Sequence, residues 1–118
     1  MKIILGLLAL LLAFPFLGMQ KAHASEVREV RAAHILVPTE DEANALKARI
    51  EKGEAFESLA KEYSKCPSGR SGGDLGYFRR GQMVREFEEA AFELEAGKTS
   101  EPVRTQFGWH LIKVYDKK

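Results

Sequence analysis

One cysteine and two histidines carry the most reactive side-chain chemistry in this sequence: Cys66, His34 and His110. The third histidine, His23, lies in an N-terminal segment that we expect to be removed. A thiol with imidazoles suits zinc binding or nucleophilic catalysis. Zinc is disfavoured because these residues lack the short ligand spacings of zinc sites, and a cysteine protease is disfavoured because no nucleophile signature surrounds Cys66. We therefore expect no metal and no cofactor.

Both retained histidines lie on segments whose sequence pattern predicts β-strands. Alternation over residues 28–37 puts His34 on one face with valine, alanine and leucine, and residues 109–115 put His110 on a face with Ile112 and Val114. A histidine on an apolar face is more often a core residue than a catalyst. If the two strands are neighbours, the rings come within hydrogen-bonding distance, and two neutral imidazoles pair well as donor and acceptor.

A glycine-rich stretch, residues 71–83, contains four glycines interleaved with Leu75, two aromatic residues and Met83. Clustered glycines shape a turn or a site more often than they fill a core. Phe87 follows Met83 by four residues and so shares its helical face. The stretch therefore indicates either a hairpin turn followed by a surface helix or an apolar cup for a substrate.

The remaining pattern predicts the elements that position these residues. Thr39 and Glu42 have the spacing of a helix capping box, and the helix that follows ends at Gly53. The other predicted elements are a helix over 56–63, a loop over 64–70, a strand over 74–79, a helix over 84–94 and a strand over 100–105 that Pro102 places at an edge or a strand start. The residues expected to face the core are Phe56, Leu59, Ala60 and Tyr63 on the first of these helices and Met83, Phe87, Ala90, Ala91 and Leu94 on the second.

Residues 1–24 have the features of a secretory signal peptide: one lysine, an apolar run and the small-residue site Ala22-His23-Ala24. We expect cleavage after Ala24, which leaves one domain over residues 25–118, and a periplasmic or extracellular location. An uncleaved membrane anchor is the alternative. The retained residues carry 16 basic and 17 acidic side chains, because two lysines leave with the signal. This balance argues against nucleic acid and anionic membranes as partners.

The order of motifs along the chain resembles the parvulin family of peptidyl-prolyl cis–trans isomerases. The motifs are His34-Ile35-Leu36, Cys66-Pro67-Ser68, Gly72-Gly73-Asp74-Leu75-Gly76-Tyr77-Phe78, Gly81-Gln82-Met83, Phe87, Ala91-Phe92 and Pro102-Val103-x-Thr105-x-Phe107-Gly108-Trp109-His110. The resemblance implies an α+β fold of the parvulin/FKBP-like kind, with a four-stranded antiparallel sheet wrapped by about four helices. It also implies that the two histidine-bearing strands are adjacent in the centre of the sheet.

Site residues follow from the same resemblance, position by position. The pocket for the substrate proline ring matches Leu75, Met83 and Phe87, with Gln82 and Phe107 at its edge. The polar residues around the isomerising bond match His34, Cys66, Thr105 and His110. Cys66 has two possible roles, as a thiolate that adds to the carbonyl or as a group that only tunes local polarity, and we favour the second because the family also accepts aspartate there.

Two positions depart from the family pattern. Glu86 stands where many relatives have proline, and the loop 38–42 is acidic where phosphate-directed parvulins carry a basic cluster. Acidic side chains there repel a phosphoryl group. The expected partners are unfolded or proline-containing polypeptides, and we expect a monomer. A non-catalytic module that binds proline-containing unfolded segments is the alternative function.

Overall fold

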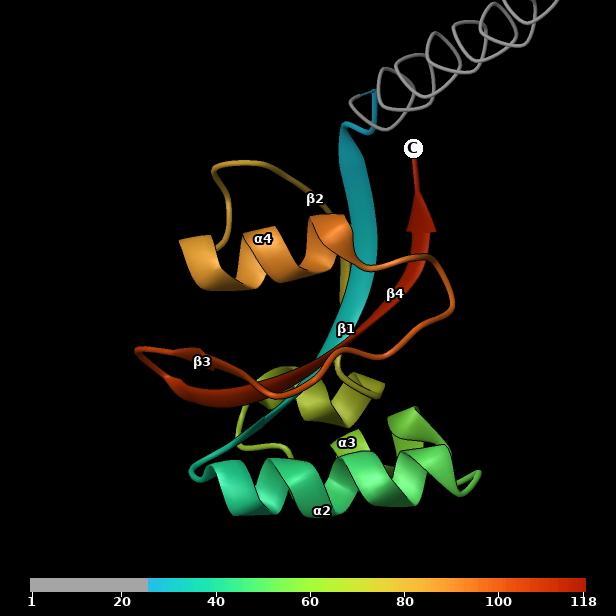
Figure 1. Cartoon of the computed structure of the whole chain (residues 1–118), viewed down its shortest axis with the longest axis vertical. Helices are drawn as coiled ribbons and strands as arrows, with labels where there is room; N and C mark the ends of the chain where they lie inside the picture. The colour runs from blue at the N-terminus through green and yellow to red at the C-terminus, as the bar shows by residue number, and fades with distance from the viewer. Residues whose placement is uncertain (1–25) are drawn as a thin grey trace, which may run out of the picture.

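The computed structural model describes residues 26–118, so the predicted signal segment lies outside the described residues (Figure 1). Within these residues, three α-helices, one 3₁₀ helix and four strands follow one another. Their order is β1 (Glu29–Val37), α2 (Glu40–Glu51), α3 (Phe56–Tyr63), η1 (Pro67–Ser71), β2 (Asp74–Arg79), α4 (Arg85–Glu93), β3 (Val103–Thr105) and β4 (Gly108–Lys117).

The four strands form one antiparallel sheet in the order β2-β1-β4-β3. The histidine-bearing strands β1 and β4 are therefore the central pair, as the family resemblance implies. Their register pairs His34 with Ile112 and Leu36 with His110. The predicted α+β fold with a four-stranded antiparallel sheet is confirmed, and η1 completes the set of about four helices.

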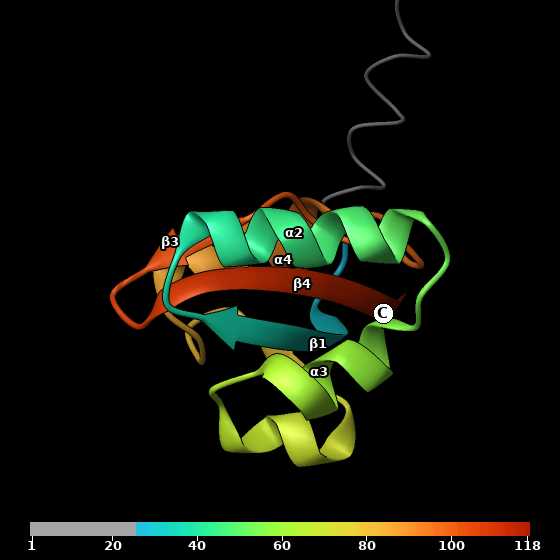
Figure 2. The same cartoon turned by 90° about the horizontal axis from the view of Figure 1, so that it is seen from below.

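Helices cover both faces of the sheet (Figure 1). On one face, α2 and α3 pack against β1 and β4, as the view from below also shows (Figure 2). On the other face, α4 packs against the same strands and β2. Alternation along β1 explains this division, because Ile35 and Val37 enter the first core whereas Val30 and Ala32 enter the second.

The predicted N-cap at the start of α2 forms, but the Glu42 side chain bonds the Thr39 hydroxyl and not the Thr39 backbone N–H of a full capping box. The Thr39 hydroxyl oxygen accepts from the Glu42 backbone N–H at 3.2 Å, and the Thr39 hydroxyl donates to the Glu42 carboxylate at 2.8 Å. A side chain that satisfies an exposed helix-terminal N–H contributes about 1 kcal/mol to stability. This cap fixes where the chain leaves β1 and turns into α2.

Several elements differ in detail from the sequence-based prediction. Residues 67–71 form η1 instead of a loop, because Pro67 begins the turn and Gly69 N–H donates to Cys66 O at 2.9 Å. Strand β3 is shorter than predicted because Pro102 has no N–H to donate to the sheet. Ser100 lies outside the strand and contacts β4 through its backbone N–H, which donates to Ile112 O, and its hydroxyl, which accepts from the Ile112 N–H.

Two aromatic residues also differ from their predicted environments. Tyr63 was expected to face the core, but it is 37% exposed and packs against Arg49. Phe92 lay off the predicted apolar face of α4, yet it is buried. Its ring meets Phe78 from β2, and the Arg80 guanidinium lies 4.2 Å from its centre.

Within residues 26–118, every helix is too short or too polar to span a bilayer.

Candidate active site

An apolar cavity of about 510 Å³ opens at the end of β1, on the face of the sheet that α4 covers. We call this cavity the cup. Residues from both central strands, the α3–η1 connection, the β2–α4 segment and the β3–β4 turn line it: His34, Leu36, Lys65, Cys66, Pro67, Leu75, Gln82, Met83, Val84, Phe87, Phe107 and His110. Its wall is therefore assembled from segments far apart in the sequence.

The apolar side of the cup is held by tight packing behind it. Phe87 is 3% exposed, and its ring meets both histidine rings edge-on at centroid distances of 5.5 and 5.4 Å. Met83 and Leu75 are only partly buried and pack beside it. Phe107, in the turn between β3 and β4, is 61% exposed. The cup thus has a rigid aromatic base and a more accessible rim.

The two histidines form a buried hydrogen-bonded pair. Their Nδ1 atoms lie 2.9 Å apart, and His110 Nε2 lies 2.7 Å from Thr105 Oγ1. Thr105 Oγ1 also accepts from the Phe107 backbone N–H at 3.1 Å. Among the described residues, His110 Nε2 is the one acceptor within reach of the buried Thr105 hydroxyl proton. The hydroxyl therefore donates to His110 Nε2, which leaves the His110 proton on Nδ1 to donate to His34.

This arrangement places the His34 proton on Nε2. Among residues 26–118, that nitrogen is the one buried side-chain polar atom without a hydrogen-bond partner. Because His34 lines the cup, its unpaired N–H is a donor at the cup wall. An unpaired buried donor is costly, so a ligand or water that satisfies it is favoured.

Burial keeps both imidazoles neutral. It lowers the pKa of His34 from 6.5 to about 4, with a further contribution from the neighbouring His110, and burial likewise lowers the pKa of His110 to about 4. Two charged rings at this separation would also repel each other in a poorly solvated site. At neutral pH both rings are therefore uncharged, and neither acts as an imidazolium acid.

Cys66 reaches the cup from the segment that joins α3 to η1. Its side chain is partly buried, and its sulfur accepts a hydrogen bond from the Ser68 hydroxyl at 3.3 Å. The Ser64 hydroxyl receives the backbone N–H groups of Leu36, at 3.0 Å, and of Cys66, at 3.3 Å. These bonds hold the cysteine beside the end of β1.

The glycine-rich stretch brings Leu75 to the cup by a close backbone approach. His34 N–H donates to Gly73 O at 3.0 Å, and a Cβ added to Gly73 would lie 2.3 Å from His34 O. Gly73 also has a φ of 84°, in the left-handed region that favours glycine. Only a residue without a side chain fits there, and β2 begins at the next residue.

All but one of the site residues expected from the sequence line the cup. The exception is Thr105, which lies behind it and contacts His110. The additional lining residues are Leu36, Lys65, Pro67 and Val84. Strand alternation from His34 could have indicated Leu36, and Val84 directly follows Met83, whereas nothing in the sequence pattern singled out Lys65.

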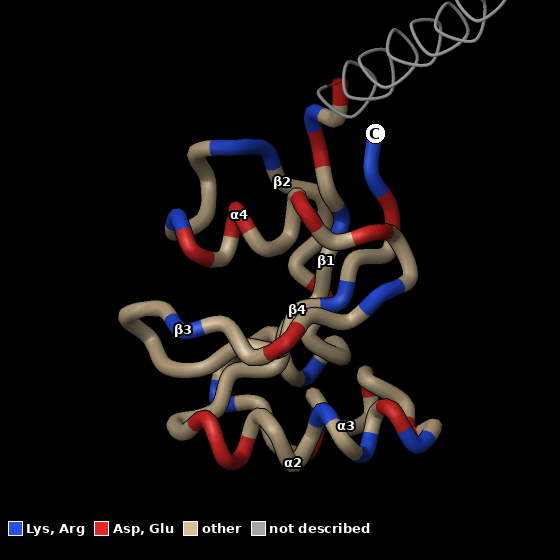
Figure 3. The backbone as a smooth tube through the Cα atoms, in the orientation of Figure 1, with Lys and Arg blue, Asp and Glu red and all other residues tan. Residues whose placement is uncertain are grey.

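No group of three or more His, Cys, Asp or Glu side chains among the described residues is arranged to hold a metal ion. The acidic first turn of α2, visible in Figure 3, contains Glu40, Asp41 and Glu42. These three carboxylates give the first turn of α2 a negative charge.

The sheet with a central histidine pair and an adjacent apolar cup defines the parvulin class of peptidyl-prolyl cis–trans isomerase domains. The family model described as "Rotamase: PPIC-type PPIASE domain" matches residues 22–116. The chain therefore belongs to the family of PPIC-type peptidyl-prolyl cis–trans isomerase domains.

Known proteins with related sequences and structures agree with this assignment. The chain is 56% identical over 90 residues to "Foldase protein PrsA" of Geobacillus kaustophilus, covering 75% of this chain and 32% of that protein. The crystal structure of the peptidylprolyl isomerase PrsA from Bacillus anthracis aligns with a TM-score of 0.76 at 46% identity, covering 78% of this chain and 43% of that one.

A smaller relative shows that this fold also makes up almost the whole of another protein. The solution structure of NmPin, the parvuline of Nitrosopumilus maritimus, aligns with a TM-score of 0.70 at 43% identity, covering 75% of this chain and 97% of that one. By contrast, the chain spans about a third of the length of the PrsA foldases that it matches.

Proposed function

We propose that this chain catalyses cis–trans rotation about X–Pro bonds in polypeptides that fold after export. The observation that carries the proposal is the cup, in which Leu75, Met83 and Phe87 adjoin a buried, neutral histidine pair. The catalytic domain would span residues 25–118, after a signal peptide over 1–24.

To catalyse this rotation, the protein needs only to bind the twisted amide more tightly than either planar form. Amide resonance gives the bond a rotation barrier of ~18–20 kcal/mol, and X–Pro exchange takes tens to hundreds of seconds. Lowering that barrier by about 4 kcal/mol accelerates exchange roughly a thousandfold. A proline ring fixed in the apolar cup, away from water, lets the preceding carbonyl rotate while the ring stays in place.

The polar residues serve this rotation without forming a covalent bond. The His34–His110 pair, with Thr105 behind it, sets the shape of the cup wall and presents the unpaired His34 Nε2–H. Cys66 tunes the polarity beside the rotating carbonyl. A neutral ring pair that is joined through its two Nδ1 atoms and held by Thr105 supports a positioning role.

The proposed substrates are unfolded segments of exported proteins that contain proline, acted on outside the cytoplasm by a monomer. Retention on the membrane by an uncleaved signal is the alternative location. The acidic start of α2 supports substrates without a phosphoryl group beside the proline, because like charges repel.

A direct test adds catalytic amounts of the protein to short X–Pro peptides and measures cis–trans exchange by NMR. The proposal predicts that exchange is much faster than the spontaneous rate when the protein is present at far less than one equivalent of the peptide. Binding that shifts peptide resonances but leaves the exchange rate at its spontaneous value would instead identify a non-catalytic binding module. A panel that varies the residue before proline would define the preference.

A further inference from the structure

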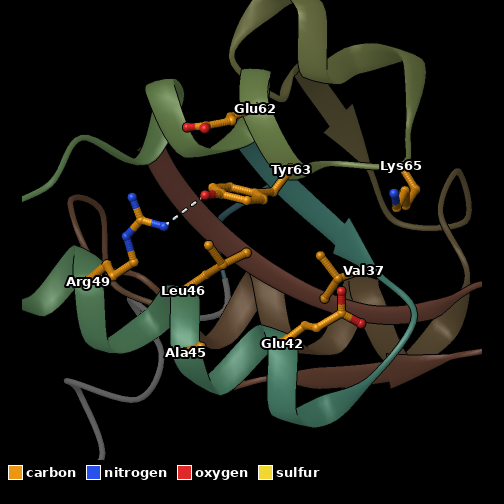
Figure 4. Close-up of a pocket in the computed structure, with 8 residues that line it drawn as sticks. All are labelled: Val37, Glu42, Ala45, Leu46, Arg49, Glu62, Tyr63 and Lys65. Carbon is orange, nitrogen blue, oxygen red and sulfur yellow. Dashed lines mark hydrogen bonds between the residues drawn. The ribbon is translucent and has the colours of Figure 1, made fainter.

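A second cavity lies on the opposite face of the sheet, between α2 and α3 beside the end of β1 (Figure 4). Its volume is about 240 Å³. We call it the side groove. Its apolar lining residues are Val37, Ala45, Leu46 and Tyr63, and Lys65 lies at one end.

The side groove combines these apolar residues with four charged lining residues, Glu42, Arg49, Glu62 and Lys65. Tyr63, which the helical pattern placed in the core, is one of three large apolar side chains exposed among the described residues. Its hydroxyl accepts from Arg49 at 3.1 Å, as the dashed line in Figure 4 marks, and Glu54 holds Arg49 through two further bonds of 2.8 Å. The aromatic ring is thereby fixed at the surface.

The side groove and the cup lie on opposite faces of the sheet and have Lys65 in common as a wall residue. Lys65 lines both cavities, and the neighbouring β1 residues Leu36 and Val37 line the cup and the side groove respectively. The Lys65 backbone N–H donates to Leu36 O at 2.8 Å, which fixes this wall to the strand. A chain that leaves the cup over Lys65 would pass round the end of β1 toward the side groove, with the aliphatic stem of lysine beneath it.

We propose that the side groove is a second subsite for the polypeptide substrate, occupied by an apolar side chain a few residues from the proline in the cup. This inference rests on the proposed function, since the occupant is the continuation of the same extended, unfolded segment. An extended chain advances about 3.3 Å per residue, so a few residues carry it across the Lys65 wall.

The experiment compares a short X–Pro peptide with long peptides that extend it by about eight residues, N-terminally or C-terminally, and include a leucine. The readout is the ratio of kcat/KM for each long peptide to that for the short one. Ala45→Trp fills the side groove from an exposed helix position, and Tyr63→Ala removes its aromatic wall. Ala48→Trp is the matched control, because Ala48 is exposed on the same helix and does not line the side groove.

For the unmodified protein, we expect a ratio of about five to ten for one of the two extensions, the gain from partly burying one aliphatic side chain. Ala45→Trp and Tyr63→Ala should bring that ratio close to one, whereas Ala48→Trp should keep it. A ratio near one in the unmodified protein, or one that Ala45→Trp and Ala48→Trp change equally, would overturn the subsite. Absence of catalysis on every peptide would overturn the proposed function, and the subsite with it.

Discussion

The buried histidine pair makes the stability of this domain depend on pH in a defined window. Both imidazoles have a pKa lowered to about 4 in the folded chain, against about 6.5 when exposed. The folded state therefore binds fewer protons than the unfolded state between these values. The contribution of the pair to the free energy of unfolding is fully present above pH 6.5 and decreases as the pH falls toward 4. Below pH 4 these two groups cause no further loss.

The size of the effect follows from the difference between the two pKa values. Each ring contributes about 3 kcal/mol, and the pair up to about 6 kcal/mol, against a total of roughly 5–15 kcal/mol for a typical domain. Near pH 5 the free energy of unfolding should fall by roughly 2 kcal/mol per unit decrease in pH, because nearly two protons are taken up on unfolding. Carboxylates held by cations, such as Asp74 by Arg31, act at lower pH, below their ordinary pKa values.

Urea unfolding followed by the fluorescence of Trp109, the single tryptophan, measures this dependence between pH 7.5 and 4.5. In His34→Leu, one titrating ring remains, so the slope near pH 5 should be about half that of the unmodified protein, whatever the absolute stability of the variant. A free energy of unfolding that stays constant between pH 7 and 5 would refute the burial of the pair. NMR titration of either ring near pH 6.5 in the folded protein would refute it as well.

Three substitutions test separate parts of the site. Cys66→Asp should keep most isomerase activity in a protease-coupled assay, and near-total loss would favour covalent addition by the thiolate. Met83→Ala should lower kcat/KM about tenfold by removing one apolar contact with the proline ring, and unchanged kinetics would remove Met83 from the site. Gly73→Ala should destabilise the domain by more than about 3 kcal/mol, because the new methyl group would clash with the His34 carbonyl oxygen and because alanine is strained at this positive φ. Gly81→Ala is its control, with a similar φ but open space around it, and should cost about 1 kcal/mol; equal losses in the two variants would contradict the close approach.

Local patterns in the sequence were sufficient to predict most of the fold. The strand over 74–79 has the bounds that the sequence predicts, and Thr39 caps α2. The hydrogen bond between His34 and His110 was expected if their strands were neighbours. That condition came from the family resemblance, since strand order depends on long-range packing that no local pattern encodes.

Features created by contacts between distant segments could not be predicted in this way. Phe92 is buried only because Phe78 and Arg80, from the preceding strand and turn, close over it. Lys65 belongs to two cavities because the chain after α3 is hydrogen-bonded to the end of β1. The short η1 helix has too few residues to show a hydrophobic period, so the sequence pattern predicts a loop there.

The central claim is that the cup holds the proline ring while the bond before it rotates. An NMR exchange experiment on one sample tests this most directly, with an isotope-labelled X–Pro peptide and the protein at substoichiometric concentration. The account predicts cis–trans exchange far faster than the spontaneous tens to hundreds of seconds. It also predicts proline-ring contacts with the Met83 methyl group and the Phe87 ring. Contacts at the cup with exchange at the spontaneous rate, or rapid exchange without those contacts, would contradict it.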